Sequence, residues 1–218
     1  MPSFTVENYI KAIYRLSKTS EGGVNTNSIA ETLGTKAATV SDMLRKLNEN
    51  GYVNYKKYQG TNLTTKGKDV AIQIIRKHRM WEVFLVDKLE FKWDEVHDLA
   101  EELEHIGSSE ITNRLEEFLD FPKVDPHGDP IPDREGNIDL SDQIPLTELL
   151  KGESGLVTGV KDSSSDFLRY LDAQGIQLGK NVKIEEIFDY DQSRTVIINK
   201  KQMSLSHQVC KNLYINKQ

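Results

Sequence analysis

Apolar residues recur at helical spacing through the first fifty residues and predict three helices. We expect these helices over residues 5–16, 28–33 and 35–50, because each segment places its apolar positions on one face. Thr26 and Asn27 are candidate N-cap residues for the short second helix. A short helix, a turn containing glycine and a second amphipathic helix are typical of the helix-turn-helix motif.

The pattern then changes to a hairpin followed by longer helices. Residues 52–63 contain two short extended runs around a basic turn with glycine, which predicts a β-hairpin wing. Helices are expected over 66–89, 93–106 and 109–119. The first of these has more apolar residues than a small winged domain needs, so we expect the surplus to form a dimer interface. The surplus consists of Ile74, Ile75, Trp81, Val83, Phe84, Leu85 and Val86.

Helical signals stop after residue 119. Residues 121–142 are rich in proline and glycine and predict a long loop. The last sixty residues then combine short β-type runs, glycine turns and one helix over 163–171, which is typical of a small β-barrel. The strands are expected over 156–160, 181–188, 195–199 and 213–215.

Composition and charge favour a DNA-binding module on an acidic body. The chain has 218 residues, 28% of them charged, and a net charge of −6. Residues 1–72 carry 10 basic and 6 acidic side chains, whereas the remainder carries 18 and 28. With no long apolar run and no signal peptide, we expect a cytoplasmic protein. The single cysteine, Cys210, cannot form an internal disulfide, so a metal site would use nitrogen and oxygen ligands.

Histidine and glutamate recur at spacings that suit metal ligation. Residues 97–105 carry His, Glu, Glu and His at positions i, i+4, i+7 and i+8, within an arc of about 100° on a helix. His78 and Glu82 form another pair at i, i+4. Such pairs build transition-metal sites in helical proteins, although isolated ones are usually solvated ion pairs. The loop segment 125–129, Asp-Pro-His-Gly-Asp, either supplies further ligands or is a polar turn.

The helix-turn-helix pattern also indicates which residues would contact DNA. Lys56 and Lys57 in the wing are expected to reach phosphates, and Arg45 either does the same or lies on a solvated face. The residues expected to face the major groove are those at the start of the second helix of the motif. They are Lys36, Ala37, Ala38, Thr39, Ser41 and Asp42.

With these motifs the chain resembles the diphtheria-toxin-repressor family of metal-dependent transcriptional regulators, in its three-domain form. The resemblance spans essentially the whole chain and is most specific over 74–82, 96–105 and 126–132. It implies a mainly α chain with a small β domain, the latter an SH3-like β-barrel also found in ferrous-iron transport proteins. The implied domains are a winged helix-turn-helix over 1–72, a helical metal-binding and dimerisation domain with a loop over 73–142, and the SH3-like domain over 150–218.

The resemblance also implies two metal ions per subunit, Mn²⁺ or Fe²⁺. One site would use His78, Glu82, His97 and Asp166, and the other would use Asn8, Glu101, Glu104, His105 and Asp125. Asn8 departs from relatives that carry Asp or Met, and Asp125 from relatives that carry Cys, so the ligands are hard donors that suit Mn²⁺ and Fe²⁺. Lys11 stands where two-domain manganese regulators place an acidic ligand, which argues against their binuclear arrangement.

The predicted function is therefore a homodimeric, metal-activated DNA-binding repressor of metal-uptake genes. Metal bound between the DNA-binding and dimerisation domains would select the conformation that matches the operator. The alternative is a winged-helix regulator of a small organic ligand, in which the His/Glu clusters are structural. A metalloenzyme is disfavoured, because the chain has no His-Glu-x-x-His motif and no evident nucleophile.

Overall fold

The computed structural model describes residues 3–20, 22–56, 59–139 and 142–218, which fall into two compact units. The N-terminal unit comprises Met1–His78, Glu101–Arg114 and Pro132–Asn137. The C-terminal unit comprises Arg79–Ala100, Leu115–Ile131 and Ile138–Gln218.

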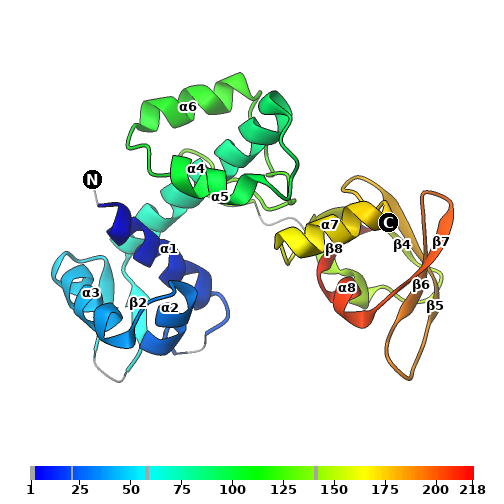
Figure 1. The fold of residues 1–218 in the computed structure, drawn as a ribbon, viewed down its shortest axis with the longest axis horizontal. Coiled ribbons are helices and arrows are strands. Elements are labelled where there is room, and N and C mark those ends of the chain that lie inside the picture. Colours follow the sequence, from blue (N-terminus) through cyan, green and yellow to red (C-terminus); the bar gives the residue numbers. More distant parts are fainter. Residues whose placement is uncertain (1–2, 21, 57–58, 140–141) are drawn as a thin grey trace. The chain divides into compact units, whose positions relative to one another are not determined.

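The N-terminal unit contains the predicted winged helix-turn-helix (Figure 1). Helices α1 (Phe4–Ser17), α2 (Thr26–Thr32) and α3 (Ala37–Glu49) precede the antiparallel strands β1 (Val53–Tyr55) and β2 (Thr61–Leu63). Their apolar faces meet in one core, which confirms the helical periodicity read from the sequence. The core includes Ile10, Ile13, Ile29, Val40, Leu44, Leu47 and Val53.

Helix α2 begins two residues earlier than expected, with a different N-cap. The side chain of Asn25 accepts a hydrogen bond from the Ser28 backbone nitrogen at 2.8 Å, so Asn25 is the cap instead of Thr26 or Asn27. In the wing, Lys57 lies outside the described residues, whereas Lys56 is described and exposed.

Three further helices follow: α4 (Thr65–Leu89), α5 (Val96–Leu103) and α6 (Ser109–Phe118). Helix α5 is shorter than the predicted 93–106. Residues 93–95 form a turn, and Glu104 and His105 lie in another turn just after the helix. The strict helical spacing assumed for 97–105 therefore holds only as far as Leu103.

The prediction that apolar residues of α4 form a dimer interface was wrong for most of those residues. Ile74, Ile75, Val83 and Leu85 are between 1% and 7% exposed, because they pack inside the subunit. Large exposed apolar side chains of the C-terminal unit come from later positions. They are Leu89, Phe91, Phe118, Phe121, Val124, Leu150, Phe188 and Tyr190.

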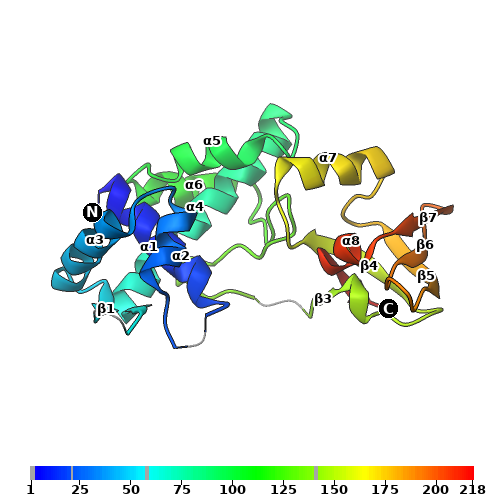
Figure 2. The same cartoon turned by 60° about the horizontal axis from the view of Figure 1, so that its bottom comes forward.

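The C-terminal unit contains a six-stranded antiparallel sheet in the order β3-β8-β4-β5-β6-β7. Helices α7 (Ser165–Gln174) and α8 (His207–Lys211) belong to the same unit (Figure 2). Leu168, Leu171 and Cys210 contribute their side chains to the core that these helices share with the sheet. The sheet confirms the predicted small β domain and four of its strands. The strands are β3 (Ile144–Pro145), β4 (Ser154–Val160), β5 (Asn181–Ile187), β6 (Arg194–Ile198), β7 (Lys201–Leu205) and β8 (Leu213–Lys217), with a 3₁₀ turn over Leu146–Glu148.

Strands β3 and β7 and helix α8 were not predicted. Four of the five residues of β7 are not buried, so it lacks the apolar alternation by which a strand is recognised. Among the described residues, no helix is both long enough and apolar enough to cross a membrane.

Candidate metal centre and DNA-binding surface

The C-terminal unit gathers four side chains of metal-ligating types from three segments. Glu82 comes from α4, His97 from α5, and Asp125 and His127 from the loop after α6. Ligand atoms of Glu82, Asp125 and His127 all lie within 4.8 Å of one another, and the three residues are 2%, 5% and 3% exposed. His97 Nδ1 lies 3.4 Å from Glu82 Oε1. These four residues are called the Glu82 cluster below.

The loop that carries Asp125 and His127 is closed by its own hydrogen bonds. Asp125 Oδ1 accepts from the backbone nitrogens of His127 at 2.8 Å and Asp129 at 3.0 Å. Gly128 has φ +88°, and a Cβ there would lie 2.1 Å from the Thr158 carbonyl oxygen. Only glycine allows this backbone conformation and this close approach to β4. The loop is therefore held against the sheet with both side chains directed inward.

The imidazole of His127 is oriented for metal ligation. Its Nε2 lies 2.9 Å from the Trp93 carbonyl oxygen, which can only accept, so Nε2 carries the proton in this hydrogen bond. Nδ1 then lies 3.7 Å from Glu82 Oε1 and 3.9 Å from Asp125 Oδ1. Because Nε2 is held by the carbonyl group, Nδ1 is the ring nitrogen that faces the carboxylates and could ligate a metal ion once it is deprotonated.

The Glu82 cluster has an excess of buried negative charge. Burial, followed by repulsion from Glu82 and Asp129, raises the pKa of Asp125 to about 7 in spite of Arg79 Nε at 3.4 Å. Burial lowers the pKa of His127, but its hydrogen bond to Glu82 and the charge of that carboxylate outweigh burial and raise the pKa to about 9. Protons thus neutralise the cluster. A divalent cation would do the same by replacing them, so these residues fit a metal ion.

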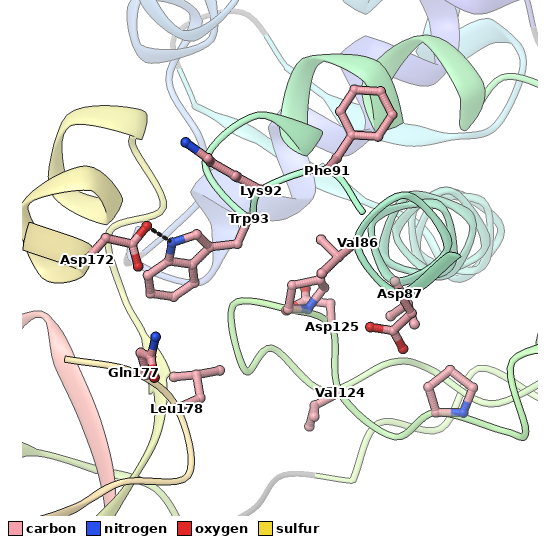
Figure 3. Close-up of a pocket in the computed structure, with 13 residues that line it drawn as sticks. Val86, Asp87, Phe91, Lys92, Trp93, Val124, Asp125, Asp172, Gln177 and Leu178 are labelled. Atoms are coloured by element: carbon pink, nitrogen blue, oxygen red, sulfur yellow. Dashed lines mark hydrogen bonds between the residues drawn. The ribbon is translucent and has the colours of Figure 1, made fainter. Parts of the chain in front are cut away.

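A pocket of about 460 Å³ borders the Glu82 cluster (Figure 3). Val86, Trp93, Val124 and Leu178 give it a largely apolar wall, and the indole nitrogen of Trp93 donates to Asp172 at 3.0 Å. Asp125 also lines this pocket, so its carboxyl group belongs to both the pocket wall and the cluster.

The N-terminal unit contains a second acidic group, with a lysine inside it. Lys11 Nζ lies 2.5 Å from Glu104 Oε2 and 3.1 Å from Glu101 Oε1. Glu104 Oε2 is also 2.7 Å from His78 Nδ1. Burial would raise the pKa of Glu104, but the His78 hydrogen bond and the charge of Lys11 hold it below its ordinary value. These four residues are called the Lys11 cluster below.

Two other expected ligands belong to the same unit. His105 Nδ1 donates to Glu7 at 2.6 Å, and its Nε2 lies 3.7 Å from Glu104 Oε1. Asn8, half-buried on α1, lines a small pocket with Lys11 and Glu101.

The structure groups some expected ligands differently from the sequence analysis. Asp125 was expected with Glu101 and Glu104, but it lies with Glu82 and His127. Asp166 is exposed in the first turn of α7. His127 was not assigned as a ligand, although the segment that contains it was noted as a possible source. Its position two residues from Asp125 was the available signal, but a loop offers no periodicity that tells which side chains converge.

The candidate DNA-binding surface lies on α3 and the wing. Lys36, the N-cap of α3, is exposed, as is Lys56. Arg45 forms an ion pair with Asp42, so these two side chains meet each other on the exposed face. Of the residues expected in the major groove, Ala38 and Thr39 are also exposed, and Ala37 and Ser41 are half-buried.

A winged helix-turn-helix in a chain that also has a buried His/carboxylate cluster defines the class of metal-responsive DNA-binding regulators. Family models agree along the chain. The N-terminal DNA-binding domain of iron-dependent repressors matches residues 2–61, their metal-binding and dimerisation domain matches 64–133, and the FeoA domain matches 144–217.

Individual relatives of the chain are named as diphtheria toxin repressors and iron-dependent repressors. The diphtheria toxin repressor of Corynebacterium glutamicum is 31% identical over 204 residues, 88% of this chain and 87% of that protein. The iron-dependent repressor IdeR of Mycobacterium tuberculosis is 30% identical over 182 residues, 73% of this chain and 79% of that protein. The match to IdeR of Mycobacterium leprae, at 36% identity over 136 residues, spans 57% of that protein.

Solved structures of metal-dependent repressors are also similar to this chain. A manganese-dependent transcriptional repressor in complex with manganese has a TM-score of 0.87 and 32% identity, covering 98% of this chain and all of that one. The manganese regulator SloR has a TM-score of 0.77, with 98% of each chain covered. The chain therefore belongs to the iron-dependent repressor family, whose members are metal-dependent transcriptional repressors and not enzymes.

Proposed function

We propose that this chain is a homodimeric repressor of metal-uptake genes that binds its operator when Mn²⁺ or Fe²⁺ is bound. The observation that carries the proposal is the Glu82 cluster, in which two buried carboxylates lie beside two imidazoles. The cytoplasm, where the operator DNA is, is the proposed location.

Glu82, His97, Asp125 and His127 are the proposed ligands, and His78, one helical turn before Glu82 on α4, is the candidate for a fifth. When bound, the metal would supply the positive charge that the cluster lacks. The donors are oxygen and nitrogen, which favours Mn²⁺ and Fe²⁺ over thiophilic ions. Burial raises the pKa of the only cysteine, Cys210, to about 11, so it offers no ready thiolate. Asp166 remains a candidate ligand from α7.

Helix α4 offers a route from the metal to DNA. It begins directly after strand β2 of the wing and continues without a break to Glu82 and beyond. Ligands that fix Glu82 therefore restrain the helix that leads into the DNA-binding domain, which would favour one orientation of α3. Lys36, Ala37, Ala38, Thr39, Ser41 and Asp42 are the proposed base-reading residues, with Arg45, Lys56 and Lys57 on phosphates.

Homodimerisation is proposed because the family model matching 64–133 is a dimerisation domain and because apolar side chains of the C-terminal unit are exposed. Two winged domains in one dimer would contact two operator half-sites.

Fluorescence anisotropy of a labelled duplex from the chain's own promoter tests the proposal. Metal-stripped protein is titrated onto the DNA at fixed salt with Mn²⁺, anaerobic Fe²⁺, Zn²⁺ or no metal. We expect DNA affinity to rise about 5–150-fold with Mn²⁺ or Fe²⁺, the usual range of allosteric coupling. Equal binding with and without these metals, on this and a second candidate operator, would contradict the proposal.

A further inference from the structure

The Lys11 cluster contains two of the side chains from which a second metal site was expected, Glu101 and Glu104, but its centre is a lysine ammonium group. Lys11 Nζ is within hydrogen-bonding distance of both Glu101 and Glu104, and it lies 3.4 Å from His78 Nδ1. One positive group therefore contacts the acidic residues that a divalent ion would need.

Burial makes this contact more than a surface ion pair. Lys11 is 4% exposed and Glu104 is 1% exposed. A charged group that deep in a protein persists only when an opposite charge and hydrogen bonds replace its water. Lys11 and Glu104 meet that condition for each other, whereas Glu101 is exposed and its charge is shared with solvent.

The remaining expected donors, His105 and Asn8, are not carboxylates. His105 Nδ1 lies 2.6 Å from Glu7, and its Nε2 lies 3.7 Å from Glu104 Oε1. Asn8 contributes a neutral amide where a carboxylate would strengthen the attraction for a cation. An entering divalent ion would thus have to displace Lys11 from Glu104, or remain a few ångströms from a like charge in a buried site.

We infer that Lys11 takes the place of a second divalent ion in this chain, so that each subunit holds one metal ion, in the Glu82 cluster. This inference rests on the proposed metal dependence and reduces the expected number of metal ions per subunit from two to one. The Lys11 ammonium group links α1 to Glu104, which follows the end of α5. Because this cation is covalently attached to the chain, the link does not depend on the supply of metal.

Metal counting on the full-length protein tests the inference. Stripped protein is equilibrated with a graded excess of Mn²⁺, and bound Mn²⁺ per subunit is obtained from the loss of the free-ion signal in electron paramagnetic resonance. We expect one ion in the wild type. Lys11→Met removes the ammonium and leaves the ligands, so we expect two ions. Lys11→Arg keeps the charge, and we expect one.

Two ions in the wild type would overturn the inference, as would one ion in a Lys11→Met variant that is folded by circular dichroism. If Lys11→Met is unfolded when stripped, folding restored by Mn²⁺ together with two bound ions would support it, and the wild-type count decides on its own in any case. Absence of bound Mn²⁺ from all three proteins would overturn the proposed function as well, which separates the two failures.

Discussion

The two acidic clusters of this protein use the same residue types and neutralise them differently. The Lys11 cluster combines two glutamates with a histidine and a lysine. The Glu82 cluster combines a glutamate and an aspartate with two histidines, which are cationic only when protonated. Histidine and carboxylate at helical spacing therefore do not define a metal site by themselves. In our proposal, a metal ion binds only where a permanent cation does not already occupy the centre of the cluster.

The pKa values of the buried carboxyl groups in the two clusters are shifted in opposite directions. In the Lys11 cluster the pKa of Glu104 is lowered, so its ionised form is stabilised by the groups around it. In the Glu82 cluster the pKa of Asp125 is raised, because burial and repulsion from Glu82 and Asp129 outweigh the attraction of Arg79 and His127. These opposite shifts are what the proposal predicts if the Lys11 cluster is neutralised by its lysine and the Glu82 cluster by protons or a metal ion.

The largest expected effect comes from breaking the Lys11–Glu104 pair. Glu104→Gln leaves a buried ammonium group without its closest anion, a change that typically costs about 3–5 kcal/mol of stability. We expect this loss in urea unfolding of the stripped protein, with Mn²⁺ affinity at the Glu82 cluster unchanged. A stable Glu104→Gln protein that binds Mn²⁺ poorly would reverse the roles assigned to the two clusters.

Glu82→Gln should lower the affinity for Mn²⁺, which Glu104→Gln should leave unchanged. The variant removes the carboxylate that both His97 and His127 face, and Mn²⁺ affinity should fall about 100-fold or more, since even outer partners of a metal site contribute 10–100-fold. Isothermal titration calorimetry measures the change, with exposed Glu102→Gln as the matched control. An equal loss in both variants would point to general charge and not to ligation.

The two clusters should also differ in their response to pH. His127, with a pKa raised to about 9, must release a proton to ligate metal, so Mn²⁺ affinity should rise up to about tenfold per pH unit between pH 7 and 9. Stripped protein should lose stability over the same range. The folded state binds protons at His127 and Asp125 that the unfolded state has released, and raising the pH removes this advantage.

Thermal unfolding at pH 7, 8 and 9 with and without Mn²⁺ tests the direction of these two pH dependences. Stabilisation by Mn²⁺ should grow as the pH rises. Stabilisation that is constant from pH 7 to 9 would mean that metal binding displaces no proton from the Glu82 cluster.

The smallest effect is expected far from both clusters, in the wing. Lys56→Ala should weaken binding to all DNA sequences alike and reduce the dependence of log affinity on log salt by about one. Anisotropy titrations at several salt concentrations, on operator and unrelated duplexes, measure this slope. A loss confined to the operator would show that Lys56 reads bases.

Periodicity in the sequence was enough to predict the winged helix-turn-helix and helix α4, on which His78 and Glu82 lie one turn apart. These features depend on spacing within one helix, which local sequence encodes. The domain class of the C-terminal sheet was also predictable, although β7, with its largely exposed side chains, was not.

The site was less predictable wherever it depends on tertiary contacts. His127 joins Glu82 because hydrogen bonds and Gly128 fold a loop, and the ring is turned by the Trp93 carbonyl group. Lys11 was noticed as a departure from relatives, but its contact with Glu104 joins residues 93 positions apart. No spacing rule connects such residues, so sequence alone left the Lys11 cluster as an expected metal site.

Anomalous diffraction from crystals grown with Mn²⁺ is the most direct test of the central claim, that the Glu82 cluster holds a metal ion and the Lys11 cluster holds a lysine. At the manganese edge, we predict one anomalous peak per subunit, between Glu82, Asp125 and His127, with Lys11 still on Glu104. A manganese peak between Glu101 and Glu104, with the Lys11 side chain turned away, would contradict the account.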